Sequence, residues 1–249
     1  MIDKMTTAEK NEIANFLDLA GDYLSSGYHG EKKEYSFKDD APLLKSSGED
    51  SLGEDSQRED SHEKIASEIH QCRNCELGNS RKNAAPGEGA LKPLVMVIGE
   101  GPGEEEDNQG RPFVGKAGHQ LDKMLAAINL SRNTNCYIAN VIKCRPPYNR
   151  NPFPVETAAC AHFLERQIQL LKPKFILVAG KVAANTLLKT NEQIGKLRGN
   201  FYQFKSGGLT IPLIITYHPS AVLRDISLKR PVWEDLKLLR AKIQETQEE

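Results

Sequence analysis

Short apolar runs alternate with amphipathic stretches through most of the chain. The runs have the length of buried strands and are expected at residues 93–99, 137–143, 175–179 and 213–217. The amphipathic stretches are expected to form helices at residues 115–129, 155–171, 181–188 and from 231 to the end. Strands that alternate with helices indicate βαβ units. The pattern therefore predicts an α/β fold, a single three-layer α/β/α domain with a central four-stranded, mainly parallel sheet. Four glycines between residues 190 and 210 predict a small hairpin there.

The first 60 residues follow a different pattern. Residues 6–25 predict one amphipathic helix, in which Thr6 and Glu9 have the spacing of a capping box. Residues 26–60 are rich in Ser, Gly, Asp, Glu and Lys, so they bury little apolar surface and are expected to be a disordered acidic linker. The apolar face of the helix needs a docking site, either on the body of the chain or on a partner protein. A further helix is expected to run from Ser61 towards Cys72 and to open the main domain, residues 61–249.

Charge is divided unevenly along the chain. The formal net charge is −1, but residues 1–66 contain 16 Asp and Glu against 8 Lys and Arg. The mildly basic remainder suits a domain that binds a polyanion, although a solubilising acidic tail explains the same asymmetry. No apolar run reaches the length of a membrane span, and Asp3, Lys4 and Glu9 interrupt any signal-peptide core. We therefore expect a cytoplasmic protein without a membrane partner.

Polar residues accompany three of the predicted strands. Glu100 lies in a Gly-Glu-Gly-Pro-Gly turn after the first strand, Asn140 lies on the second strand, and His218 follows the fourth. Because ligands of open α/β sheets bind beyond the carboxyl ends of the strands, we expect these three side chains to converge there. The turn lacks the Gly-Lys-Ser/Thr of a Walker loop and the third glycine of GxGxxG, so it does not indicate a nucleotide-phosphate site.

Each of these residues also has an ordinary structural explanation. Glu100 could be a solvated turn carboxylate, and a lone histidine such as His218 is usually structural. Asn140 could cross-link the core, or it could read a flat heterocycle with its donor and its acceptor. Phe113, on the loop before the helix at residues 115–129, could anchor the core or stack on a base.

Four of the five cysteines have the spacing of a metal site. Cys72 and Cys75 form a tight pair, Cys144 ends the second strand, and Cys160 lies inside the next helix. Four thiolates suit zinc or an iron–sulfur cluster, and one tight pair with two dispersed ligands favours the cluster. Cys136 is expected to be a packed core thiol.

Together these motifs resemble the family 4 uracil-DNA glycosylases, the iron–sulfur branch of that superfamily. The resemblance covers roughly residues 67–245 and rests on the four cysteines and on segments 99–107, 110–115, 140–147 and 218–220. Glu100 is typical of family 4, because the first motif of family 5 lacks that carboxylate. The resemblance implies a structural [4Fe–4S] cluster, with zinc as the less favoured occupant. Its ligands would be Cys72, Cys75, Cys144 and Cys160.

The same resemblance implies a role for each residue of the convergent site. Phe113 would stack on a uracil flipped out of DNA, Asn140 would pair with its O4 and N3 edge, and His218 would face O2. His218 and backbone N–H groups near Gly101 would stabilise the negative charge on the leaving uracil. Glu100 would position water or stabilise the sugar cation. The implied enzyme is a monofunctional hydrolase of N-glycosyl bonds that leaves an abasic site and so initiates base excision repair.

Residues 219–224 align with the DNA-penetrating loop of that family. Leu223 would fill the vacated base position, and Arg224, Arg198 and Lys196 would contact phosphates. Ala221 stands where many relatives carry a bulkier residue. The implied partner is uracil-containing DNA, single- or double-stranded, bound by a monomer.

Two other functions compete with this interpretation. The first is a non-catalytic nucleic-acid-binding module, stabilised by a metal or a cluster, in which Glu100, Asn140 and His218 can be replaced without loss. The second is a glycosylase with a broader specificity for deaminated bases, against which Glu100 and Asn140 speak.

Overall fold

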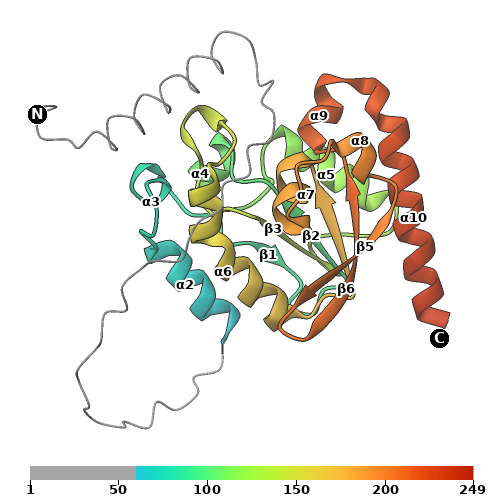
Figure 1. Ribbon diagram of the computed structural model, residues 1–249, viewed down its shortest axis with the longest axis horizontal. Coiled ribbons are helices and arrows are strands. Elements are labelled where there is room, and N and C mark those ends of the chain that lie inside the picture. The colour runs from blue at the N-terminus through green and yellow to red at the C-terminus, as the bar shows by residue number, and fades with distance from the viewer. Residues whose placement is uncertain (1–59, 249) are drawn as a thin grey trace, which may run out of the picture. The chain divides into compact units, whose positions relative to one another are not determined.

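A six-stranded sheet forms the centre of the computed structural model, which describes residues 60–248 (Figure 1). The strand order is β1-β3-β2-β4-β6-β5. Its four inner strands are parallel: β2 (Val95–Gly99), β3 (Cys136–Asn140), β4 (Phe175–Ala179) and β6 (Leu209–Thr216). These correspond to the four predicted strands, and the α/β class is confirmed.

Two antiparallel edge strands, β1 (Glu88–Gly89) and β5 (Phe201–Ser206), correct the number of strands from four to six. β1 is two residues long, so it contains no apolar run that could have indicated it. β5 forms a hairpin with β6 through Gly207 and Gly208, which both adopt the positive φ that a tight hairpin turn requires. The predicted hairpin is therefore present, but it lies further towards the C-terminus.

Helices cover both faces of the sheet (Figure 1), so the three-layer arrangement is confirmed. One layer consists of α5 (Lys116–Ala126), α9 (Pro219–Arg224) and α10 (Lys229–Glu248). The other consists of α6 (Pro154–Leu171), α7 (Lys181–Leu188) and α8 (Ile194–Leu197). Neighbouring strand residues such as Val97 and Ile98 face opposite layers, which explains why the inner strands are apolar throughout.

A smaller apolar cluster packs beside the sheet. α2 (His62–Gln71) begins where predicted, with Ser61 as its N-cap, and the short α3 (Leu77–Ser80) follows. Ile69 of α2 packs in one cluster with Phe163 of α6. This packing places the segment after α2, which carries the first cysteine pair, beside the cysteine-bearing helix α6.

The predicted helix at residues 6–25, and the predicted linker apart from its last residue, lie outside the described residues. None of the helices within residues 60–248 is long and apolar enough to cross a bilayer.

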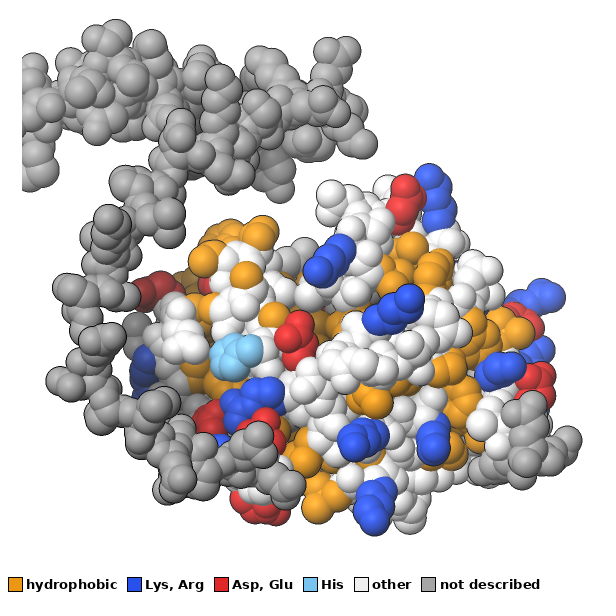
Figure 2. Space-filling view, turned by 60° about the horizontal axis from the view of Figure 1, so that its bottom comes forward, with side chains coloured by type: hydrophobic (Ala, Val, Ile, Leu, Met, Phe, Trp, Pro, Cys, Tyr) orange, Lys and Arg blue, Asp and Glu red, His pale blue; other side chains and the backbone are white. Residues whose placement is uncertain are grey.

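Figure 2 shows one face of the molecule, on which Lys and Arg side chains are interspersed with apolar and uncharged surface. The positive charge on that face is therefore spread out rather than gathered in one patch.

Candidate active site

A cavity of about 720 Å³ opens at the carboxyl ends of the parallel strands. Glu100 and Gly101 line it from the turn after β2, and His218 lines it from the end of β6. Phe113 lines it from the loop between α4 (Glu104–Gln109) and α5. The structure thus brings Glu100 and His218 together, as the sequence predicted, whereas Asn140 is not among the residues that line the cavity.

The Asn140 side chain is buried and unpaired, and it lies close to Phe113, which lines the cavity. It is 1% exposed, and neither its Oδ1 acceptor nor its Nδ2 donor has a hydrogen-bond partner within the described residues. Gly99 leaves the necessary space, because a Cβ there would lie 2.5 Å from Asn140 Oδ1 and 2.4 Å from the Phe113 ring. An unpaired buried amide lowers stability. A core cross-link would have satisfied it, so the geometry favours an amide that pairs with a ligand.

His218 is a neutral histidine with a defined tautomer. Burial lowers its pKa to about 4, and the positive charge of Arg224 acts in the same direction. The backbone N–H of Ser220 donates to Nδ1 at 3.2 Å, and the Ser220 hydroxyl lies 2.8 Å from the same nitrogen. Because Nδ1 accepts, the single ring hydrogen of the neutral imidazole lies on Nε2. His218 can therefore offer one hydrogen-bond donor to a ligand.

Phe113 is held against His218 by a constrained loop. The two ring centroids are 5.5 Å apart, and the backbone of Phe113 has a left-handed φ of 52°, which is unfavourable for a residue with a side chain. Arg132 supports this conformation by donating to the carbonyl of Phe113 at 2.8 Å. Gly118 permits the close approach, because a Cβ there would lie 1.9 Å from the same carbonyl oxygen. The aromatic ring is thereby fixed at the cavity wall.

Glu106, which the sequence analysis did not single out, connects the two loops of the site. Its Oε1 atom accepts from the backbone N–H groups of Val114 and Gly115, both at 2.9 Å, and its Oε2 accepts from Gly103 at 3.1 Å. One carboxylate therefore anchors both the Gly-rich turn and the loop that carries Phe113. The sequence signal for Glu106 was its position, three residues after a helix N-cap. That spacing predicts a capping box but does not predict a hydrogen bond to a second loop.

Glu100 lines the cavity and is half-buried. Burial raises its pKa above the ordinary value of 4.5. Its backbone carbonyl accepts from the N–H of Ile142 at 3.2 Å, which fixes the turn after β2 to the segment after β3. A carboxylate in this position can polarise a water molecule or stabilise a nearby cation.

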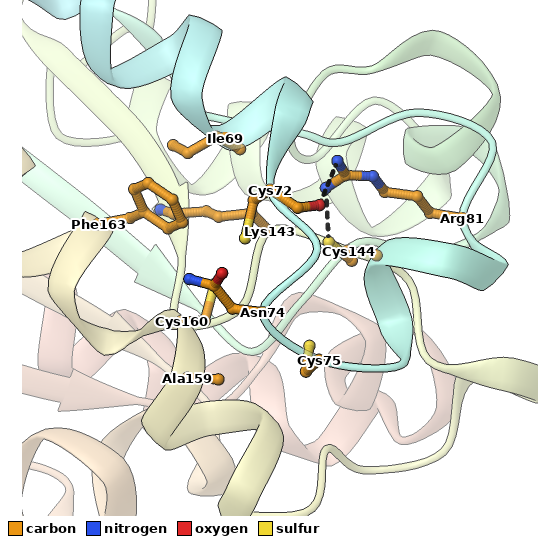
Figure 3. A pocket seen from close by; sticks show the side chains of 11 residues that line it. Ile69, Cys72, Asn74, Cys75, Arg81, Lys143, Cys144, Ala159, Cys160 and Phe163 are labelled. Carbon is orange, nitrogen blue, oxygen red and sulfur yellow. Dashed lines mark hydrogen bonds between the residues drawn. The ribbon is translucent and has the colours of Figure 1, made fainter.

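The four predicted metal ligands line one small cavity beside the sheet (Figure 3). They are Cys72, Cys75, Cys144 and Cys160. Arg81 donates to the Sγ atom of Cys144 at 2.8 Å, and so brings positive charge to the site. Within residues 60–248, no three His, Cys, Asp or Glu side chains converge closely enough to hold a single metal ion. Cys136 is fully buried in a different apolar cluster, as predicted for a packed thiol.

Comparison with known proteins assigns the family. Residues 86–237 match the family model of the Uracil DNA glycosylase superfamily. The chain belongs to this superfamily. The type-4 uracil-DNA glycosylase of Pyrobaculum aerophilum is 42% identical over 180 residues, which are 71% of this chain and 91% of that protein. The type-4 uracil-DNA glycosylase of Thermotoga maritima is 43% identical over 178 residues, which are 70% of this chain and 91% of that protein.

A type-5 uracil-DNA glycosylase of Pyrobaculum aerophilum is more distant. It is 30% identical over 150 residues, which are 53% of this chain and 63% of that protein. The similarity is thus greater to the type-4 relatives, and the resemblance to family 4 that the motifs indicated is confirmed.

The side chains predicted to contact DNA differ in how exposed they are and in whether they already have a partner within the protein. Leu223 on α9 is 51% exposed, and Arg224 lines the cavity. Arg198 instead donates to both carboxylate oxygens of the fully buried Asp235, at 2.7 and 3.0 Å. Its guanidinium is therefore engaged in the core, which favours a structural role for Arg198 over a phosphate contact. Lys196 is exposed on the short helix α8.

Proposed function

We propose that this chain is a monofunctional uracil-DNA glycosylase that hydrolyses the N-glycosidic bond of uracil in DNA and leaves an abasic site for base excision repair. The observation that carries the proposal is the unpaired, buried Asn140 amide close to Phe113, which lines a cavity together with Glu100 and His218. The similarity to the type-4 uracil-DNA glycosylases of Pyrobaculum aerophilum and Thermotoga maritima supports the same substrate.

Base recognition follows from the chemistry of the Asn140 amide. Uracil reaches such a cavity when it is flipped out of the DNA stack, and its ring would then lie against Phe113. Its N3–H would donate to Asn140 Oδ1, and its O4 would accept from Nδ2. Cytosine presents the opposite polarity at these two positions, so the amide would reject it.

Bond cleavage would be assisted by the neutral His218. Departure of uracil leaves positive charge on the sugar and negative charge on the base. The Nε2–H of His218 would donate to O2 of uracil, where the negative charge collects, and backbone N–H groups near Gly101 would add to this stabilisation. Glu100 would polarise the attacking water or stabilise the sugar cation, and both roles require the ionised carboxylate.

We also propose that the four cysteines of the small cavity hold a structural [4Fe–4S] cluster. The four cysteines line a common cavity, and four thiolates could hold either zinc or an iron–sulfur cluster. Their spacing in the sequence, one tight pair with two dispersed ligands, favours the cluster. When bound, the cluster would tie the segment after α2 to the segment after β3 and to α6, and it would take no part in base excision.

The proposed partner is uracil-containing DNA, single- or double-stranded, bound in the cytoplasm by a monomer. For the helix predicted at residues 6–25, two docking sites are proposed as alternatives: the body of the chain and a partner protein.

The test uses an oligonucleotide with one uracil, incubated with the purified full-length chain and then treated with alkali. Strand cleavage that requires both the uracil and the alkali is expected. Cleavage without alkali would indicate a lyase, and cleavage at hypoxanthine would indicate the broader-specificity glycosylase. A folded protein that binds DNA and releases no base would favour the non-catalytic module.

Asn140→Asp is the matched variant for this test. It keeps the size of the side chain and its Oδ1 acceptor but loses the Nδ2 donor. Discrimination between uracil and cytosine should weaken, and unchanged discrimination would exclude Asn140 as the group that reads the base.

A further inference from the structure

Tyr148, in the loop between β3 and α6, is exposed without a structural reason. Its side chain is 98% exposed, more than any other large hydrophobic side chain within the described residues. The loop runs beside α4 (Figure 1). Arg145 of the loop lies 3.7 Å from the carboxylate of Glu104 on α4. Core packing, which explains the position of Phe113, therefore does not explain that of Tyr148.

The backbone of this loop is built to hold Tyr148 outward. Tyr148 and Asn149 have left-handed φ values of 57° and 56°, which are unfavourable for residues with side chains unless the surroundings enforce them. Arg145 enforces them by donating to Asn149 Oδ1 at 2.8 Å, and the N–H of Asn149 donates to the carbonyl of Pro146 at 3.0 Å. An exposed aromatic on a fixed backbone has little conformational freedom to lose when it binds.

The far side of the loop is anchored as well. Arg150 forms a two-pronged ion pair with Glu156 of α6, at 2.6 and 2.8 Å, and its guanidinium lies 3.8 Å from the centre of the Phe153 ring. The Arg150 guanidinium therefore already covers one face of the Phe153 ring. The residues that follow Tyr148 in the chain, Asn149, Arg150 and Asn151, are polar, and Tyr148 supplies the one aromatic ring of residues 145–151.

The loop also borders the proposed uracil cavity. Pro146, Asn149 and Arg150 line that cavity, so Tyr148 is flanked on both sides in the sequence by residues of the cavity wall. Arg224 of the other predicted DNA-contact segment lines the same cavity. A strand whose uracil enters the cavity would therefore bring a flanking nucleotide to the rim that carries Tyr148.

We propose that Tyr148 stacks on the nucleobase next to the flipped uracil, so that the segment at residues 146–151 is a second DNA-contact element. This inference rests on the proposed function. An aromatic ring can bind any base through its π-face, and the flanking base exposes such a face in a single strand or when uracil leaves the stack. The contact should therefore contribute most on single-stranded substrates, where the neighbouring base is not already paired.

The experiment measures single-turnover excision by the full-length chain over a range of enzyme concentrations, on a single-stranded oligonucleotide with one uracil. Tyr148→Ala should raise the half-saturating enzyme concentration on the order of tenfold, and the plateau rate should fall by much less. Tyr148→Phe keeps the ring and should restore wild-type saturation. Leu91→Ala is the matched control, because Leu91 is another exposed apolar residue, 52% exposed, and is not part of the cavity wall.

A second substrate carries abasic spacers on both sides of the uracil. The difference between the wild-type chain and Tyr148→Ala should disappear on it, because the stacking partner is missing. Equal half-saturation on the ordinary substrate would overturn the inference. A defect that persists on the spacer substrate would also overturn it, because the loop would then act through something other than a base. A wild-type chain that excises no uracil would show that the proposed function itself is wrong.

Discussion

The ammonium group of Lys143 donates a hydrogen bond to the backbone carbonyl of Asn140 at 3.0 Å. Lys143 is 1% exposed, lines the cysteine cavity and also donates to Gln167 Oε1 at 2.7 Å. Gln167 in turn donates to the carbonyl of Pro86 at 2.9 Å. A buried polar chain therefore connects the wall of the proposed cluster site with the strand end that carries the Asn140 amide.

Lys143→Met should weaken both stability and catalysis. The variant keeps the apolar stem but leaves the Asn140 carbonyl and the Gln167 oxygen without their donor, which costs about 1–3 kcal/mol for each buried group. We expect a lower melting temperature, together with slower excision because the end of β3 is less firmly held. Lys92→Met, at an exposed lysine, is the control. Wild-type stability in Lys143→Met would contradict the role assigned to this chain of contacts.

The fall of the excision rate at low pH should result from protonation of Glu100. Burial raises the pKa of Glu100 above 4.5 and lowers that of His218 to about 4, so Glu100 gains a proton first as the pH falls. Single-turnover rates should then fall about tenfold per pH unit below the pKa of Glu100 while His218 is still neutral. Glu100→Gln should be slower by on the order of 100-fold and should lack this fall at low pH. An unchanged fall in Glu100→Gln would assign the titration to another group.

Gly99 should tolerate no side chain. A Cβ there would lie 2.4 Å from the Phe113 ring and 2.5 Å from Asn140 Oδ1, so Gly99→Ala must displace the Phe113 ring or the Asn140 amide. Because displacements of about 1 Å at reacting groups can reduce rates on the order of 100-fold, kcat/KM should fall by about that factor. Gly195→Ala is the control, since its Cβ would have no neighbour closer than 3.9 Å. Similar kinetics for both variants would show that the site is looser than the structure indicates.

The inner strands were predictable because burial on both faces leaves a continuous apolar run, and β4 occupies the predicted residues 175–179. The edge strands were not, because β1 pairs through two residues with no apolar pattern. In the site, Glu100, Asn140 and His218 follow from one rule, that ligands bind at the carboxyl ends of parallel strands.

The supports of the site were harder to predict than the site itself. Glu106 binds N–H groups on another loop, and Arg198 finds its carboxylate on α10, far along the chain. Sequence spacing gives no information on such contacts, because they depend on how separate elements pack. The phosphate contact predicted for Arg198 rests on the sequence alone, whereas its ion pair with the buried Asp235 depends on how α10 packs.

The cysteines of the small cavity should determine the colour and iron content of the protein. Purified wild-type chain is expected to be brown and to contain iron rather than zinc. Cys144→Ala should lose both colour and iron, and it should lower the melting temperature because α2 and α6 lose their shared anchor. Cys136→Ala removes a buried thiol outside that cavity and should keep both. Zinc in a colourless wild-type protein would contradict the cluster.

Arg198 and Arg224 should respond in opposite ways to the same substitution. Arg198→Met leaves the fully buried Asp235 without its partner, and the loss of one member of a buried ion pair costs about 3–5 kcal/mol. Its melting temperature should therefore drop sharply. Arg224→Met should keep its stability but bind DNA more weakly, and the slope of log affinity against log salt concentration should decrease by about 1. Thermal unfolding and salt-dependent binding of both variants measure this contrast. A stable Arg198→Met chain with a reduced salt slope would instead show that Arg198 contacts DNA. In that case Asp235 would be protonated in the core, because burial already raises its pKa.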